Sequence, residues 1–283
     1  MNEKDFVSFS DTIEESQNPN IDNIDIEQFH IDRYNNTKKT SDIYNCELCG
    51  NKGMIAFKNK YNQMAFRHCK CYDIRKNREK MKELGLLDFI SSTYAIENLQ
   101  PKEEWEKKVI QIAYDYIANK NNCSFFYGGA VGGGKTTICA NMMAKKIQQN
   151  PEFMADYIVW DTSYKDLEFA EWGAERLEEL KKVDILFIDD LFRSARVKPI
   201  NEVEREKAKA IIDYRYRHKL ITIISSELYL SEIEEFDEAI GSRIYEMCGK
   251  GKFIANTKRE KTRNHRKEKD RILEKKMTSL FDI

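Results

Sequence analysis

Residues 125–137 read FFYGGAVGGGKTT, and five of the chain's twelve glycines fall within the seven positions from Gly128 to Gly134. Residues 129–136 satisfy the pattern G-x-x-x-x-G-K-[ST], with an apolar segment before it and apolar residues at helical spacing after it. Glycines reach positive φ at little cost, and the N–H groups at a helix N-terminus favour an anion. The stretch therefore predicts a strand, a phosphate-binding loop and a helix. An ordinary glycine-rich turn is the alternative, which this context disfavours.

Within the loop, the backbone is expected to surround the phosphates of ATP, and two side chains have separate roles. Lys135 would contact the β- and γ-phosphates, and the Thr136 hydroxyl would hold Mg²⁺. The nucleotide-binding residues predicted in this way are Gly129, Ala130, Val131, Gly132, Gly133, Gly134, Lys135, Thr136 and Thr137.

The composition of the 283 residues favours one core domain of ordinary size and a smaller appendage. The formal net charge is −1, but residues 1–45 hold ten acidic against four basic side chains, and residues 258–276 hold ten basic against four acidic ones. There is no run of eighteen apolar residues, and the N-terminus is acidic where a secretory signal would be basic and then apolar. We expect a cytoplasmic protein with no membrane partner.

Residues 1–45 are rich in Asn, Asp, Ser and Thr, with isolated isoleucines and no sustained periodicity. Such a segment buries too little apolar surface to order itself, so a disordered acidic arm is predicted. The arm is either a plain tether or a short docking segment that folds on a partner.

Four cysteines follow the arm in two close pairs on either side of a stretch that alternates polar and apolar residues. Zn²⁺ in structural sites takes four thiolate or imidazole ligands in a tetrahedron. A zinc ribbon formed by Cys46, Cys49, Cys69 and Cys71 is therefore predicted, with His68 as an alternative ligand because the C-x-C pair is tight. Free or redox-active thiols are the other possibility. Four protein ligands leave no open position, so the metal would be structural.

A basic stretch, residues 70–82, comes directly after the second cysteine pair. It could contact nucleic acid, but a solvated helix face is the simpler interpretation.

Two consecutive acids, Asp189 and Asp190, end the apolar segment 183–188. Strands and helices alternate on both sides of it, which predicts a parallel sheet with helices on both faces. A carboxylate at the carboxyl end of a neighbouring strand can hold Mg²⁺ through water, and its successor can orient the attacking water. Asp as a helix N-cap is the alternative.

The motifs together resemble those of the AAA+ helicase loaders of the DnaC/DnaI type, in the form carried by phages and Gram-positive bacteria. The resemblance covers residues 46–266 and rests on GGAVGGGKTT, ILFIDDLF, IIDYRYRHKLITIISSEL, DEAIGSRIYEMC and a terminal NHR. It implies an α/β fold: an AAA+ P-loop core with a five-stranded parallel sheet and little or no lid, after a small zinc-ribbon-like module. The implied organisation is an arm (1–45), a zinc-binding helicase-docking module (46–85), an AAA+ ATPase domain (86–257) and a basic tail (258–283).

The resemblance also assigns roles to single residues. Lys135 and Thr136 match the Walker A positions, and Asp189 and Asp190 the Walker B positions, where the second acid is more often Glu. Glu227 falls where relatives commonly have a sensor asparagine, so the sensor role is altered or rests with Ser226. Catalytic roles for arginine follow from the same match. Arg243 corresponds to the arginine finger that reaches a neighbouring subunit's nucleotide, while Arg215 and, more weakly, Arg266 are candidates at the subunit boundary.

Only 26 residues follow Thr257, too few for the multi-helix lid of many AAA+ proteins. Turnover by the chain alone is therefore expected to be weak, and self-association through the ATPase domain should complete the site. The leading interpretation is an ATPase that loads the replicative DnaB-type helicase onto single-stranded DNA during replication initiation, with ATP, Mg²⁺ and Zn²⁺ as cofactors. The alternatives are a transposition helper AAA+ ATPase and a nucleotide-gated scaffold with little hydrolysis.

Overall fold

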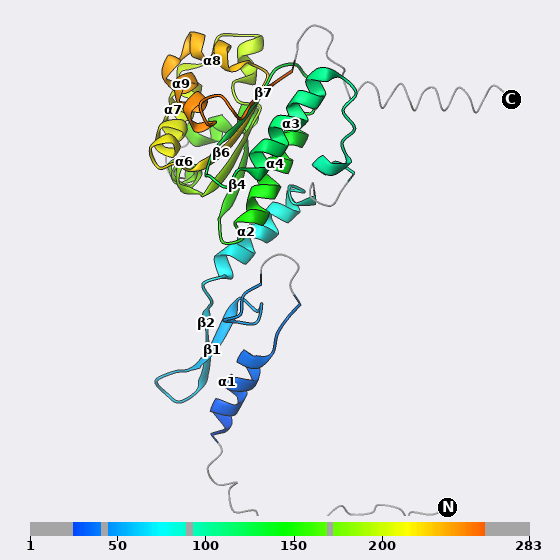
Figure 1. The fold of residues 1–283 in the computed structure, drawn as a ribbon. Helices are drawn as coiled ribbons and strands as arrows, with labels where there is room; N and C mark the ends of the chain where they lie inside the picture. Colours follow the sequence, from blue (N-terminus) through cyan, green and yellow to red (C-terminus); the bar gives the residue numbers. More distant parts are fainter. Residues whose placement is uncertain (1–24, 41–44, 89–92, 169–171, 258–283) are drawn as a thin grey trace, which may run out of the picture. The chain divides into compact units, whose positions relative to one another are not determined.

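The structure, a computed structural model, describes residues 25–40, 45–88, 93–168 and 172–257 (Figure 1). The chain divides into two compact units, Met1–Tyr72 and Asp73–Ile283. The predicted tail 258–283, with Arg266, lies outside the described residues, as does most of the arm.

The larger unit contains a five-stranded sheet in the order β4-β5-β6-β3-β7. Its neighbouring strands all run parallel. The strands are β3 (Phe125–Gly128), β4 (Ala155–Val159), β5 (Ile185–Asp189), β6 (Ile221–Ser226) and β7 (Ile254–Asn256). The residues of β5 and β6 are all buried, as expected for central strands covered on both faces. The predicted α/β class and five-stranded parallel sheet are confirmed.

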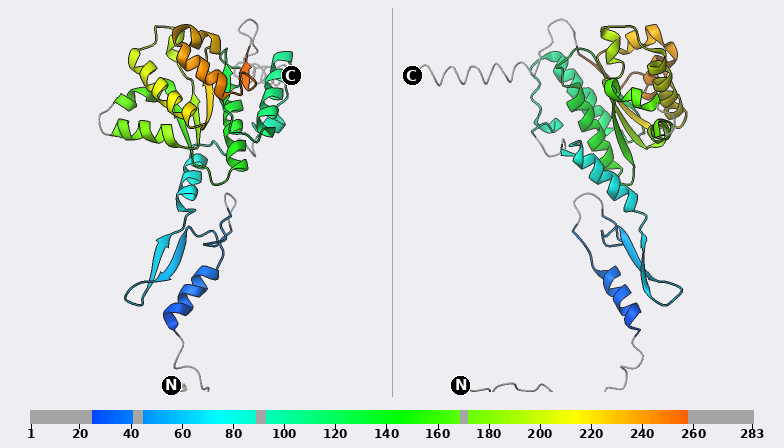
Figure 2. Two further views of the ribbon diagram at one scale, coloured as in Figure 1. Left: turned by 60° about the vertical axis from the view of Figure 1, so that its left-hand side comes forward. Right: turned by 180° about the vertical axis from the view of Figure 1, so that it is seen from behind.

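Helices cover both faces of this sheet, with α3 and α4 on one face and α6, α7 and α9 on the other (Figures 1 and 2). The helices of this unit are α2 (Tyr72–Glu83), α3 (Glu104–Ala118), α4 (Lys135–Gln149), α5 (Trp160–Ser163), α6 (Trp172–Lys182), α7 (Glu202–Arg217), α8 (Leu230–Phe236) and α9 (Glu238–Met247). The described part of this unit also contains the short 3₁₀ helices η3 (Ile96–Asn98), η4 (Tyr164–Glu168) and η5 (Arg193–Arg196). Among the described residues, no helix is long and apolar enough to span a membrane.

Helix α2 carries much of the basic stretch that the sequence suggested as a solvated face. One member departs from that expectation, because the Arg78 side chain is buried and donates from Nη2 to the carbonyls of Pro151 and Phe153 at 2.9 and 2.7 Å. Asn77 donates to the Ala155 carbonyl at 2.7 Å and accepts from its N–H at 2.9 Å. These two residues bind the start of β4, so part of the basic stretch has a structural role.

The smaller unit consists of helix α1 (Ile26–Asn36) and the antiparallel hairpin of β1 (Met54–Lys58) and β2 (Met64–His68). The prediction of disorder is therefore wrong for residues 26–36. Asp25 caps α1 by accepting from the Gln28 N–H at 3.0 Å. Asn35 then donates to the carbonyl of Ala56 and accepts from its N–H, both at 3.0 Å. The helix is stabilised by contacts with β1, which local periodicity does not reveal.

Arg215, predicted at a subunit boundary, is instead fully buried at the end of α7. Its Nε donates to the Thr222 hydroxyl at 2.8 Å. Its Nη1 and Nη2 donate to the carbonyls of Leu180, Lys181, Val183 and Ile221 at 3.0, 3.2, 2.7 and 2.6 Å. Burial lowers the pKa of this guanidinium to about 9. The boundary prediction is wrong, because the side chain caps the C-terminal end of α6 and joins it to β6.

Arg215→Ala should lower the free energy of unfolding of the larger unit by about 3 kcal/mol or more, because several buried carbonyls would lose their donor. Chemical denaturation followed by circular dichroism measures this. The exposed Arg217 at the end of the same helix provides the control, and Arg217→Ala should unfold like wild type. If Arg215→Ala is as stable as wild type but has lost ATP turnover, Arg215 has a catalytic role and the structural assignment is wrong.

Candidate functional site

The loop from Gly129 to Gly134 joins β3 to α4 at the carboxyl edge of the sheet. Gly129, Gly132 and Gly134 have φ of 119°, 80° and 77°, a region that glycine enters without strain. Gly134 is the N-cap of α4, and Lys135 is the first residue of this helix. The loop therefore places several backbone N–H groups and the positive end of the helix dipole at one edge of the sheet.

Thr257, directly after β7, packs against this loop. Its hydroxyl accepts a hydrogen bond from the Ala130 N–H at 2.6 Å, and its carbonyl accepts from the Tyr229 hydroxyl at 2.6 Å. A Cβ at Gly133 would lie 2.5 Å from the Thr257 methyl carbon. On the other side, the Tyr127 hydroxyl donates to the Gly133 carbonyl at 2.8 Å. Thr257 and Tyr127 thus fix the loop's shape, a function that no local sequence pattern indicated.

The Lys135 ammonium lies inside the loop, donating to the carbonyls of Gly129 and Ala130 at 3.0 and 2.8 Å. The side chain is buried, and this desolvation lowers its pKa. A cation held against the phosphate loop can exchange these carbonyl contacts for charge-assisted hydrogen bonds to a phosphate chain.

Asp189 ends β5 and lies beside Thr136, whose Oγ1 donates to Asp189 Oδ1 at 3.2 Å. The Tyr157 hydroxyl donates to Oδ2 at 3.2 Å, and the Ser225 hydroxyl also donates to this carboxylate. Desolvation raises the pKa of Asp189, with a further contribution from the charge of Asp190. The structure brings together the hydroxyl and the carboxylate that the sequence predicted for Mg²⁺.

Lys135 and Thr136 line a cavity of about 800 Å³. Its lining includes residues 132–137 of the loop and helix, Val131, Asp190, Arg193 and Glu227. Residues before β3 form another part of its lining, among them Tyr94, Asn98, Pro101, Trp105, Val109 and Ile110. The volume and the mixture of apolar and charged groups are those of a small-molecule site.

The two candidates for the sensor role are placed differently. Glu227 lines the cavity, and its carboxylate lies 3.2 Å from Arg193 Nε. Ser226 is buried, and its single hydroxyl proton is directed to the Leu191 carbonyl at 2.6 Å. A hydroxyl has one donor, so Ser226 has none left for a phosphate. In this arrangement Ser226 does not line the cavity, whereas Glu227 does.

Arg243 lies on α9 and is not among the residues that line the cavity. Its Nε is 3.0 Å from Asp213 Oδ1 on α7, and its Nη1 donates to the Ala239 carbonyl at 2.9 Å. About 30% of the side chain is exposed, unlike that of Arg215. Within one chain, the structure keeps Arg243 apart from the phosphate loop.

The four predicted cysteines of the smaller unit form one buried cluster, with their sulfurs within 4.8 Å of one another. The Sγ atoms of Cys46 and Cys69 are 3.7 Å apart, and those of Cys49 and Cys71 are 3.5 Å apart. Four sulfurs at about 2.3 Å from a tetrahedral Zn²⁺ would be about 3.8 Å apart, so the cluster fits such an ion. Although burial opposes ionisation, the Gly53 N–H and the neighbouring thiols lower the pKa of Cys49 to about 7.

His68, the alternative ligand, is exposed and stacks on Tyr72 with ring centroids 3.7 Å apart. It does not belong to the cluster of metal-binding groups. The four-cysteine arrangement is the one that the geometry favours.

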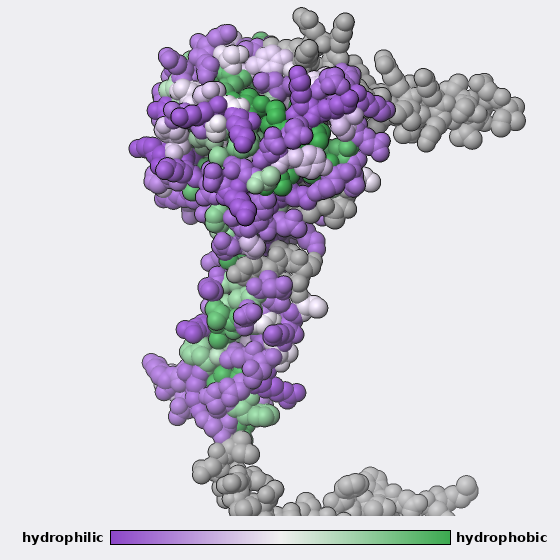
Figure 3. Space-filling model, viewed as in Figure 1, coloured by the Kyte–Doolittle hydropathy of each residue, from purple (hydrophilic) through white to green (hydrophobic). Residues whose placement is uncertain are grey.

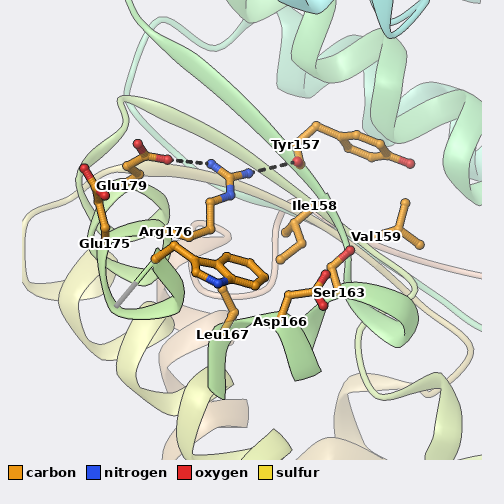
Figure 4. A pocket seen from close by; sticks show the side chains of 10 residues that line it. Tyr157, Ile158, Val159, Ser163, Asp166, Leu167, Glu175, Arg176 and Glu179 are labelled. Carbon is orange, nitrogen blue, oxygen red and sulfur yellow. Dashed lines mark hydrogen bonds and ion pairs between the residues drawn. The ribbon is translucent and has the colours of Figure 1, made fainter. Parts of the chain in front are cut away.

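A second cavity of about 470 Å³ lies beside β4 and α6, and no predicted site residue lines it. Figure 4 shows Arg176 at its edge, between Glu179 and the carbonyl of Tyr157, at 3.0 and 3.5 Å. Arg176 also pairs with Asp156. The guanidinium is engaged by these neighbours, and the chemistry expected from the motifs is concentrated in the larger cavity.

A parallel sheet with a glycine-rich loop and two acids at its carboxyl edge defines an α/β P-loop nucleotide-binding core. No protein-family model matches the chain. Two proteins of Bacillus subtilis (strain 168) are similar to it. The phage-like element PBSX protein XkdC is 29% identical over 223 residues, which is 72% of this chain and 80% of XkdC. The uncharacterized protein YqaM is 28% identical over 191 residues, which is 64% of this chain and 61% of the length of YqaM.

Two solved structures are similar to part of the chain. The crystal structure of the DnaC helicase loader is 19% identical, with a TM-score of 0.47, and the match covers 59% of this chain and 100% of that one. The crystal structure of DnaI is 18% identical, with a TM-score of 0.47 and coverage of 60% and 92%.

Gly133→Ala should weaken ATP binding roughly 10-fold, because the new Cβ would overlap the Thr257 methyl group. Thr257→Ser removes that methyl group and keeps the hydroxyl, so the double variant should recover most of the affinity. Titration with ATP and Mg²⁺ measures the dissociation constants.

Gly134→Ala is the control for this pair. Its Cβ would meet no atom within 4 Å, but its φ is 77°, so its defect comes from backbone strain. Thr257→Ser should not restore it. Failure of Thr257→Ser to improve Gly133→Ala would show that the loop is not shaped by this contact.

Proposed function

We propose that this protein is an ATP-dependent loader that binds a hexameric DnaB-type replicative helicase and places it on single-stranded DNA. The observation that carries the nucleotide part of the proposal is the convergence of Lys135, Thr136, Asp189 and Asp190 at one edge of the sheet, where all but Asp189 line a single cavity. The helicase and DNA parts are supported by the motif resemblance.

The proposed chemistry is hydrolysis of the terminal phosphoanhydride bond of ATP. Lys135 and the loop N–H groups bind the phosphates, Thr136 and Asp189 hold Mg²⁺, and Asp190 orients the attacking water. Mg²⁺, when bound, offsets the charge of the phosphates. Asp190 is one methylene shorter than the more common Glu, so we expect slow turnover by the chain alone.

The smaller unit, which contains the four-cysteine cluster and is called the cysteine-bearing unit below, is the proposed helicase-docking module. It exposes large apolar side chains on α1, the cysteine turn and the hairpin: Ile26, Phe29, Leu48, Phe57, Tyr61 and Phe66. Figure 3 shows apolar side chains reaching the surface of this unit. Exposed apolar groups among polar ones are typical of protein-binding surfaces.

A nucleotide-gated scaffold with little hydrolysis is the second candidate. It is favoured by the ion pair between Arg193 and Asp190, 3.1 Å apart, which engages the carboxylate that should orient water. Measuring ATP turnover with and without helicase and single-stranded DNA separates the two. A loader should be stimulated by these partners, whereas a scaffold should bind helicase in an ATP-dependent manner without turnover. Absence of any helicase binding in a pull-down would overturn both.

Zinc removal should unfold the cysteine-bearing unit, because so short a segment has little apolar core of its own. A strong chelator should abolish helicase binding while nucleotide binding persists. Elemental analysis should find one zinc ion per chain in wild type and in Cys123→Ser, which lies outside the cluster, and less in Cys69→Ser. Zinc-free protein from a chelator-free purification would contradict the site.

Arg243 is proposed to act in trans, so that ATPase activity belongs to an assembly. Arg243→Ala should bind ATP normally but lose the stimulated turnover, whereas Lys135→Ala should lose binding. Because the two defects lie on opposite sides of one subunit boundary, mixed variants should regain partial activity in a steady-state ATPase assay. Wild-type turnover per subunit that stays constant on dilution to monomers would argue for a structural Arg243.

A further inference from the structure

Arg193 connects two acids at the wall of the nucleotide cavity. Its Nη1 lies 3.1 Å from Asp190 Oδ2, and its Nε lies 3.2 Å from Glu227 Oε1. All three side chains line the same cavity as Lys135 and Thr136. No sequence motif assigns a role to this arginine, which entered above only through its ion pairs with Asp190 and Glu227.

The local backbone directs Arg193 back over the acids. Asp190 and Phe192 both have positive φ, 58° and 56°, in residues that are not glycine. Phe192 is buried, with its ring in edge contact with that of Phe236 at 5.2 Å between centroids. Such backbone is costly unless its surroundings impose it, and it clusters at functional sites. The turn after β5 is thus anchored by Phe192 in a shape that returns the next side chain to the cavity.

The positive charge of Arg193 offsets the negative charge of Glu227 at the cavity wall. A carboxylate at Glu227 has no proton to donate and would repel a phosphate. Arg193 neutralises that carboxylate, and its guanidinium carries five N–H donors, of which the contacts to the two acids use two. Further donors therefore remain for a ligand in the cavity that Arg193 lines. About 49% of the side chain is exposed, so ion pairs rather than close packing hold it, and it can adjust to a ligand.

We propose that Arg193 binds the terminal phosphate of a nucleoside triphosphate held by the same chain, with Glu227 as its positioning residue. The pair makes the site prefer ATP to ADP. This inference rests on the proposed function, because it needs a nucleotide on the phosphate loop. It gives the site a cis arginine, distinct from Arg243.

The test measures dissociation constants of ADP and of the non-hydrolysable analogue AMPPCP, with Mg²⁺, on the full chain. Arg193→Ala should lower AMPPCP affinity about tenfold or more, as for a lost charge-assisted hydrogen bond, and leave ADP affinity within about twofold. Arg205 forms a similar i,i+3 ion pair, with Glu202, away from the cavity. Arg205→Ala should bind both nucleotides like wild type.

A double variant distinguishes two roles of Arg193: binding the phosphate, or only holding the Asp190 side chain in place. Arg193→Ala leaves the Glu227 charge facing the phosphate, so adding Glu227→Gln should recover part of the AMPPCP affinity. Equal loss for both nucleotides, no loss for either, or no recovery in the double variant overturns the role of Arg193. If wild type binds neither nucleotide, the proposed function fails as well, and that result is distinct from the others.

Discussion

The hydrogen bond from the Ala130 N–H to the Thr257 hydroxyl fixes the geometry on which the site depends. It joins the phosphate loop to the residue after β7, and β7 is the neighbour of β3 in the sheet. Thr257 approaches so closely that a Cβ at Gly129 or Gly133 would lie 2.2 or 2.5 Å from its side chain. Glycine is therefore needed at these positions because a side chain would overlap Thr257, and the approach of a phosphate is a separate reason for glycine in the loop. A loop fixed in this way pays less ordering entropy when a ligand binds.

Burial of the charged groups at the candidate site prepares it for a ligand of mixed charge. Desolvation raises the pKa of Asp189 and lowers that of Lys135, so each group is destabilised in its ionised form. A cation beside Asp189 and an anion beside Lys135 would both relieve this cost. The two groups therefore suit different ligands: Asp189 suits a metal ion, and Lys135 suits a phosphate. The free-energy cost of burying these two charges in the nucleotide-free protein is relieved on binding, and this relief contributes to the affinity for a metal–nucleotide complex.

The features that were predicted correctly are determined by residues close together in the sequence. The glycine-rich loop, the buried strand ending in Asp189 and the alternation of strands and helices are local patterns, and all occur as predicted. The failures depend on distant contacts. Helix α1 is stabilised by Asn35, which pairs with a residue 21 positions away. Arg215 has a polar sequence context typical of a surface, and only the packing of α7 on α6 buries it. Thr257 gave no signal because its role follows from the adjacency of β7 and β3.

The position of Thr257 has a mechanical consequence. The chain continues from it directly into the basic segment 258–276, so one residue separates that segment from the phosphate loop. A force applied to the segment by any bound partner acts first on Thr257 and its hydrogen bond to Ala130. In this chain, Thr257, the residue directly before the C-terminal segment in sequence, is itself hydrogen-bonded to the phosphate loop.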